Sequence, residues 1–370
     1  MKHAVGAMTP EHLFEIAYRL GTDSAAEREL DAWLSGVTPR EAVALAAAAR
    51  VSFRHGVWRT YVPLDAPIPA GRLDEVAPRH PLAVAALLST HRSGYVRELA
   101  LARLVESTDD RGLPFLLLRT DDIVPVLRSV AEHAVQARVR TELAPALARS
   151  LGLLEVLRRR ARGGRSLLVR RVDEVLGDPA CRPALVAASA DDEPLVRRKA
   201  LALRLRGEPA SAVLAVAAAD ADTGVRLWAA RTTFSRETTD YDKRALLPLF
   251  EGSRSAWARS LALRARARLD PTDAPIEAAL LDPHGAVRRV ARVLLRARHP
   301  ERDFGGTRAR ALAVLADPAA RPAAVVGALG ALADVGLAVD APLAAALASA
   351  ESAPRRVRAE AERTAKLLGA

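Results

Sequence analysis

Residues 282–291 read DPHGAVRRVA, and this pattern of an Asp-led turn followed by Val-Arg-x-x-Ala decides the fold. It returns at residues 191–200 (DDEPLVRRKA) and 220–229 (DADTGVRLWA), and at 122–131 (DIVPVLRSVA) with Leu in place of Val. In all four copies the Arg follows the Asp by six residues. Such a recurrence indicates a repeated structural unit.

The repeat period follows from the motif arginines. Those of the four copies and of three looser ones fall at positions 97, 128, 197, 226, 259, 288 and 358. The steps between them are 31, 69, 29, 33, 29 and 70 residues, so each long step spans two units with a degenerate unit between. A period of roughly 30 to 35 residues is typical of a two-helix solenoid unit.

The motif has a physical rationale. Its Val, its Ala and the Leu that follows lie at i, i+4 and i+7, which forms one apolar stripe on a helix. The Asp precedes that helix, where a carboxylate can cap exposed N–H groups. The Arg lies about 100° from the stripe and can reach a turn carboxylate of its own or a neighbouring unit. We therefore expect a ladder in which Arg197, Arg226 and Arg288 bind turn carboxylates such as those of Asp191, Asp220 and Asp282.

These motifs resemble the HEAT-repeat family, particularly its shorter bacterial form related to phycobilin-lyase subunits. The resemblance covers roughly residues 80–370. It implies an all-α fold, a right-handed α-solenoid of about eight HEAT-like helical-hairpin repeats. Because that family spans scaffolds, chaperones, lyases and DNA glycosylases, it specifies fold far better than function.

The first 80 residues lack the motif. Helix-start signals predict three helices near residues 9–20, 23–34 and 38–53, the last opening with a capping box, Thr38-Pro39-Arg40-Glu41. Residues 54–81 contain five prolines and predict a long connecting loop. We therefore divide the chain into an N-terminal helical cap with its loop, 1–80, and a solenoid, 81–370.

Composition narrows the function classes. Aromatics make up only 4% of the 370 residues, and the single Cys181 excludes an intramolecular disulfide and is expected to be a buried apolar side chain. No apolar run approaches the ~18 residues of a membrane span, so we expect a cytoplasmic protein without membrane contact. The eight histidines are scattered without metal-ligand spacing. We predict no catalytic, metal or cofactor site, and a non-enzyme is the favoured interpretation.

The positive charge is uneven. Residues 155–171 hold seven Arg against one Glu, and residues 251–310 hold 13 Arg against seven acids. Arg158, Arg159 and Arg160 are the densest part of the first segment. One interpretation is a surface for nucleic acid or an acidic partner. The alternative is that ladder arginines and solvated helix faces account for much of the charge.

A helical wheel on the second helices predicts a groove. Residues two, five and nine after the motif Val point away from its stripe, and we expect them on the concave face. These positions supply an apolar middle, Leu201, Leu205, Leu227, Phe234 and Leu263, and a basic end, Arg289, Arg292 and Arg296. Alternatively, loops or a neighbouring helix cover the apolar ones.

The leading functional hypothesis is a protein-binding scaffold or adaptor. Its groove would hold an amphipathic segment of a partner protein, and its arginine end would hold the segment's acids. The alternative is a nucleic-acid-binding protein, including a repair protein similar to the HEAT-like alkylpurine DNA glycosylases. In that case Trp228 or Trp257 would supply the aromatic contact, although no acid is obviously paired with either.

Overall fold

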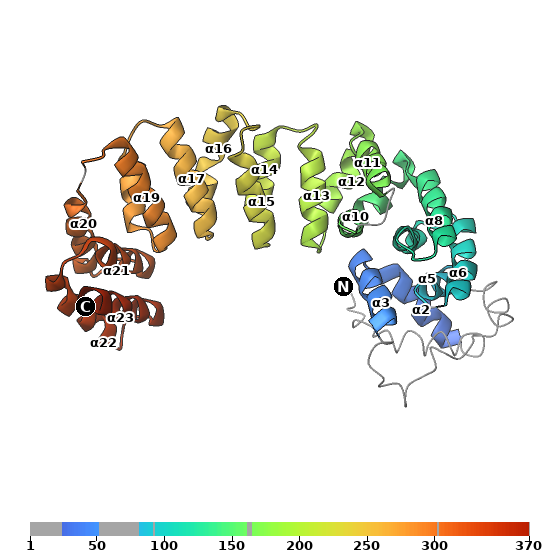
Figure 1. The fold of residues 1–370 in the computed structure, drawn as a ribbon, viewed down its shortest axis with the longest axis horizontal. Coiled ribbons are helices and arrows are strands. Elements are labelled where there is room, and N and C mark those ends of the chain that lie inside the picture. Colours follow the sequence, from blue (N-terminus) through green and yellow to red (C-terminus); the bar gives the residue numbers. More distant parts are fainter. Residues whose placement is uncertain (1–23, 52–80, 92, 161–164, 302, 370) are drawn as a thin grey trace. The chain divides into compact units, whose positions relative to one another are not determined.

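The computed structural model describes residues 24–51, 81–91, 93–160, 165–301 and 303–369, and within these ranges the chain is helical without a strand. The predicted all-α class is thereby confirmed. The chain forms two compact units, Met1–Gly207 and Glu208–Ala370 (Figure 1). The predicted helix near residues 9–20 and most of the Pro-rich loop lie outside the described residues.

The described helices of the first unit run from the N-terminal region to the motif helix of residues 191–200. They are α2 (Ser24–Gly36), α3 (Pro39–Val51), α5 (Pro81–Leu88), α6 (Gly94–Glu106), α7 (Leu113–Arg119), α8 (Pro125–Arg138), α9 (Ala144–Arg149), α10 (Leu151–Arg158), α11 (Arg165–Leu176), α12 (Arg182–Ala188) and α13 (Pro194–Arg204), with short 3-10 helices η1 (Asp110–Gly112), η2 (Thr141–Leu143) and η3 (Pro179–Cys181).

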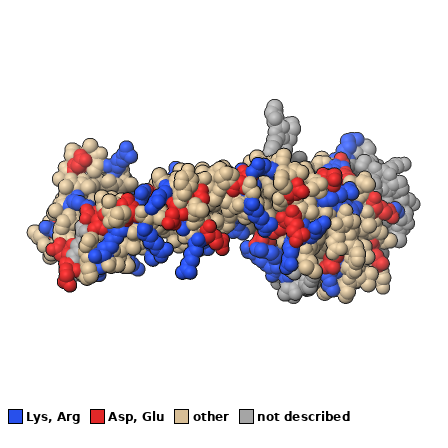
Figure 2. All heavy atoms as spheres, turned by 90° about the horizontal axis from the view of Figure 1, so that it is seen from above, with Lys and Arg blue, Asp and Glu red and all other residues tan. Residues whose placement is uncertain are grey.

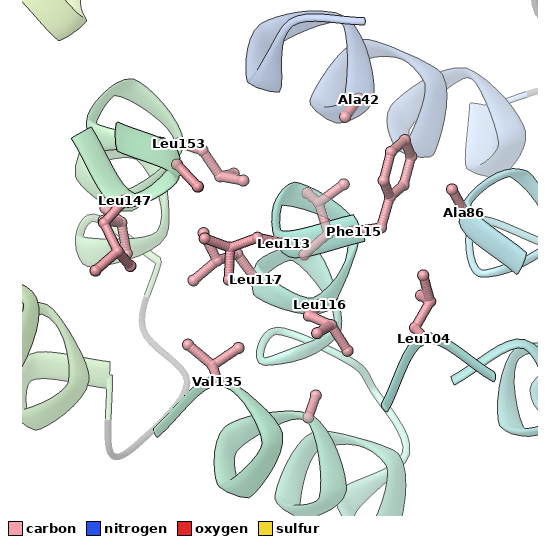
Figure 3. Packing of buried hydrophobic residues seen from close by; sticks show 14 of the residues in the cluster. Ala42, Ala86, Leu104, Leu113, Phe115, Leu116, Leu117, Val135, Leu147 and Leu153 are labelled. Carbon is pink, nitrogen blue, oxygen red and sulfur yellow. The ribbon is translucent and has the colours of Figure 1, made fainter. Parts of the chain in front are cut away.

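Helix α7 is the centre of the first unit. All four side chains of its Phe-Leu-Leu-Leu run are buried, because other helices surround it on every side (Figure 3). Phe115 points toward Ala42 of α3 and lies 5.8 Å from the Trp33 ring of α2, measured between ring centroids. A helix that is apolar all round is expected to be buried, and here it joins the unit into one continuous core.

The N-terminal helices form as predicted. The expected ranges 23–34 and 38–53 correspond to α2 and α3, and Thr38 and Glu41 make the predicted capping box through reciprocal side-chain to backbone hydrogen bonds. The predicted boundary at residue 80 falls outside the described residues. The helices on either side of it, α3 and α5, both belong to the first unit.

The second unit continues the alternation of first and second helices. Its helices are α14 (Ala210–Ala218), α15 (Thr223–Thr233), α16 (Asp240–Glu251), α17 (Ala256–Leu269), α18 (Ala274–Ala278), α19 (Gly285–Arg298), α20 (Gly305–Ala316), α21 (Pro322–Val335), α22 (Ala341–Ser349) and α23 (Arg355–Gly369), with η4 (Ala279–Leu281) and η5 (Ala338–Asp340).

Packing in the second unit follows chain order. The first helices α14 and α16 contact each other, and the second helices contact one another in the order α15, α17, α19 (Figure 1). The buried residues include separate clusters, one around α17 to α19 and others around α21 and α23. Contacts limited to neighbours are typical of repeat proteins.

The predicted apolar stripe is confirmed in both units. The motif Val and Ala side chains are almost completely buried at Val196, Val225, Val287, Ala200, Ala229 and Ala291. Cys181 is also buried, as expected.

Helix α21 occupies one of the degenerate repeats and packs unusually closely. A Cβ atom on Gly327 would overlap the carbonyl oxygen of Leu281, and one on Gly330 would overlap the guanidinium of Arg288. Glycine at these two positions therefore lets α21 approach the preceding turn and the motif arginine.

Candidate functional site

The motif arginines share one structural role. Six of them donate from Nη1 to the backbone carbonyl of the residue six positions earlier, at 2.7–3.0 Å. The six are Arg97, Arg128, Arg197, Arg226, Arg259 and Arg288. Each arginine thereby closes the turn between the two helices of a hairpin, where carbonyl groups would otherwise lack partners.

The ladder arginines have a further acceptor that the sequence did not predict. Arg197, Arg226 and Arg288 lie at the turns as expected, and each donates to the carbonyl oxygen of its own turn aspartate. The side chain of each turn aspartate accepts the backbone N–H two residues on, as Asp191 does from Glu193. It therefore stabilises the turn and does not cap the helix. Arg288 finds its carboxylate at Asp334, 2.8 Å away.

Two links of the expected ladder between neighbouring units are present. Arg97 forks onto the Asp122 carboxylate at 2.8 and 2.9 Å, and Arg259 forks onto Asp282 at 2.7 and 2.8 Å. Burial alone would raise the pKa of Asp122, but hydrogen bonds from Arg97 and the Val124 amide, with the charge of Arg119, lower it below its ordinary value. These arginines hold the fold together and are not available to a ligand.

The predicted apolar groove is wrong at two of its positions. Leu201 is 0% exposed and Leu263 is 6% exposed, so both belong to the core. They lie five residues after the motif residue, about 140° from it on the wheel. A second helix packs against its own first helix and against neighbouring second helices, so the buried arc is wider than a single stripe.

The other three groove residues are half-buried. Leu205, Leu227 and Phe234 each keep part of their surface, and Phe234 packs edge-on against Phe250 with ring centroids 5.4 Å apart. On α17 the exposed positions lie instead one residue before the motif residue and six and ten after it, at Trp257, Arg264 and Arg268. The exposed surface of α17 is therefore rotated from the predicted one, whereas on α19 Arg289 and Arg296 are exposed at the predicted positions.

In the second unit, the exposed side of the second helices carries arginines without ion pairs. Helices α15, α17 and α19, which pack side by side, contain 11 arginines and no acidic residue. Five of the arginines are exposed and form no ion pair with a described residue. We call these five, Arg231, Arg264, Arg268, Arg289 and Arg296, the arginine face.

The arginine face includes two of the three predicted residues of the basic end. Arg289 and Arg296 are exposed as predicted, whereas Arg292 is half-buried and pairs with Asp334 at 2.5 Å. Two arginines of the face lie over aromatic rings. The Arg231 guanidinium is 4.7 Å from the Trp257 ring centroid, and that of Arg296 is 5.4 Å from the Phe304 centroid.

The predicted basic cluster at the C-terminal end of α10 has acidic partners. Arg158 and Arg159 pair with Glu155 at 2.8 and 3.3 Å, and Arg160 pairs with Asp121 at 2.9 Å. Both carboxylates are buried, so each is a strong local counter-charge. On the face shown in Figure 2, Lys and Arg are likewise interspersed with Asp and Glu in both units. Local pairing, not net charge, thus distinguishes the arginine face from the cluster at Arg158, Arg159 and Arg160.

The helical wheel did not predict a second surface feature. On α6 and α8 of the first unit, the position before the motif residue carries an exposed apolar side chain, with Tyr95 83% and Val126 65% exposed. Leu99, Ile123 and Val130 are exposed beside them. We call these five residues the apolar face. The sequence could have predicted this face, because Tyr95 and Leu99 stand at the same repeat positions as Val126 and Val130.

The metal-ligand types and the single thiol are candidates for a reactive arrangement among the described residues. Within them no group of three or more His, Cys, Asp or Glu side chains is placed to hold a metal ion. Burial, with the charges of Asp178 and Glu142, raises the pKa of the Cys181 thiol, which disfavours a reactive thiolate. No described helix is long and apolar enough to cross a membrane.

No protein-family model, curated protein or solved structure matches the chain.

Proposed function

We propose that the protein is a helical-repeat binding protein whose arginine face holds nucleic acid. The observation that carries this proposal is five exposed arginines without ion pairs on three adjacent helices that lack any acid. Phosphate contacts supply most of the affinity of nucleic-acid-binding proteins, and arginine is well suited to them. A cytoplasmic location fits this partner.

The architecture belongs to the same proposal. We propose a right-handed solenoid of about eight HEAT-like repeats, as the resemblance of the motifs implies. Support comes from six motif arginines that make the same bond to a carbonyl six residues earlier. Further support comes from the stacking of second helix on second helix in α15, α17 and α19. Such arrays present long surfaces for binding.

Salt-titrated binding tests the proposal. Affinity for a fluorescent oligonucleotide should fall steeply as salt rises, because each phosphate contact releases condensed counterions. If all five arginines contact phosphate, the slope of log K against log salt should be about −3.5 to −4.5. Absence of binding at low salt would contradict the proposal.

A matched pair of variants localises the site. Arg264→Gln with Arg268→Gln should reduce the salt slope by about two, because two phosphate contacts are lost. The control is Arg355→Gln with Arg356→Gln on α23, which are also exposed and change net charge equally. Equal loss in both variants would show a general charge effect and no site.

A second candidate function is the protein-binding scaffold, now placed on the apolar face. Exposed apolar patches mark interaction sites, and Glu98, exposed beside Tyr95 and Leu99, makes no ion pair with a described residue. The occupant would be an amphipathic helix with apolar side chains at i, i+3 and i+4 and a basic residue for Glu98. A Leu- and Lys-containing model helix should bind the native protein and fail to bind Val126→Glu with Val130→Glu.

A further inference from the structure

We infer that the arginine face takes a single strand of nucleic acid, with an unpaired base stacked against Trp257. This inference rests on the proposed function and specifies its ligand. It begins with one stripe of α17, where Trp257, Arg264 and Arg268 follow one another at i, i+7 and i+11 and so share a helix face. A flat apolar surface and two cations therefore lie within about 17 Å along one helix.

The indole of Trp257 is available to a ligand. It is 39% exposed although it belongs to a packed helix, and its only described ring contact is with the Arg231 guanidinium from the neighbouring α15. A guanidinium stacked on an indole is held in place and retains N–H donors at its edge. Trp257 and Arg231 together thus offer a base-stacking surface beside a phosphate-binding group.

The next helix repeats the combination. On α19, Arg289, Val293 and Arg296 lie at i, i+4 and i+7, and all three are exposed. An apolar side chain between two unpaired arginines gives a base or sugar a contact between two phosphates. A surface serving the backbone alone has no need of Trp257 or Val293.

This alternation distinguishes a single strand from a duplex. In a duplex the bases stack on one another, and their faces cannot reach an aromatic side chain. In a single strand each base has an accessible face, and stacking on aromatic residues combines with a positive surface for the backbone. The arginine face has both parts of the second arrangement.

Binding of three ligands of equal length tests the inference: a mixed-sequence single strand, its duplex, and an abasic single strand. The single strand should bind about 5- to 150-fold more tightly than the abasic strand, the loss of one stacked base. Trp257→Ala should weaken the single strand by a similar factor and leave the abasic strand unchanged. Trp257→Phe should restore most of the affinity.

The control is Tyr241→Ala, which removes an exposed aromatic side chain from α16, outside the arginine face. It should leave all three affinities unchanged. If Trp257→Ala does not fold, quenching of tryptophan fluorescence by the single strand, present in the native protein and lost in Trp257→Phe, tests the same contact.

The outcomes separate the two proposals. Salt-dependent binding that is equal for the single strand, the duplex and the abasic strand would overturn the inference and leave the proposed function standing. Lack of binding to any of the three at low salt would overturn both.

Discussion

The second helices of the two units differ in the chemistry of one outer position of the repeat. One residue before the motif residue, both units carry an apolar side chain, as at Tyr95 and Val126 in the first and Trp257 in the second. Six residues after it stand Ala102 and His133 in the first unit, but Arg231 and Arg264 in the second. Because the motif specifies only the buried side and the turn, the outer positions are free to differ, and function is expected there.

The cores of the two units differ as well. The first unit has one continuous core around α7, filled by large side chains such as Phe115 and Leu117. The second includes local clusters, and in α21 four of the seven buried residues are Gly or Ala. A central helix couples the whole unit, whereas local clusters couple only neighbours.

The largest expected effect comes from the two ladder links, which differ in burial. Asp122→Ala should cost about 3–5 kcal/mol of unfolding free energy, because it leaves Arg97 and Arg119 buried without this carboxylate. Asp282→Ala removes the more exposed link to Arg259 and should cost about 1–3 kcal/mol. Urea unfolding measures both, and equal losses would show that burial does not distinguish the links.

Substitutions in the cores of the two units should differ in how far their destabilising effect spreads. Gly330→Ala should destabilise the second unit by about 1–3 kcal/mol, because the new methyl group overlaps the Arg288 guanidinium. Hydrogen exchange should show the loss locally, around α19 and α21. Phe115→Ala serves as the comparison, since the cavity it leaves should raise exchange throughout the first unit. If each variant raised hydrogen exchange evenly through its whole unit, the two cores would not differ in how they couple their helices.

A pH-dependent difference is expected within the first unit. Burial, with repulsion from Asp191, raises the pKa of Glu193 although Arg40 opposes this, so its charged form destabilises the fold. Glu193→Gln should therefore increase stability at pH 7 by under about 1 kcal/mol, and the gain should vanish below the ordinary pKa, where Glu193 is protonated in both states. The lowered pKa of Asp122 has the opposite consequence: its charged carboxylate stabilises the fold, and this stabilisation is lost as pH falls through the lowered pKa. For Glu193→Gln, a gain in stability that persists in acid would show a packing effect instead.

The smallest expected effect is on the outer faces themselves. Exchanging their chemistry, with Val126→Arg and Val130→Arg in the first unit or Arg289→Val and Arg296→Val in the second, should change stability by less than about 0.5 kcal/mol per substitution. These side chains are exposed, so folding does not depend on them. Thermal unfolding is the measurement. A large loss would show that the faces are covered in the folded protein.

The sequence alone determined the helical class, the hairpin period, the buried stripe at Val287 and Ala291, and the capping box at Thr38, because each depends on local spacing. It also placed Arg289 and Arg296 on the surface. Tertiary structure decided the rest. Leu201 and Leu263 are buried by neighbouring helices. Arg292 forms an ion pair with Asp334 of α21, and Arg231 of α15 stacks on Trp257 of α17. A helical wheel describes one helix in isolation, whereas exposure and ion pairing depend on which helices lie beside it.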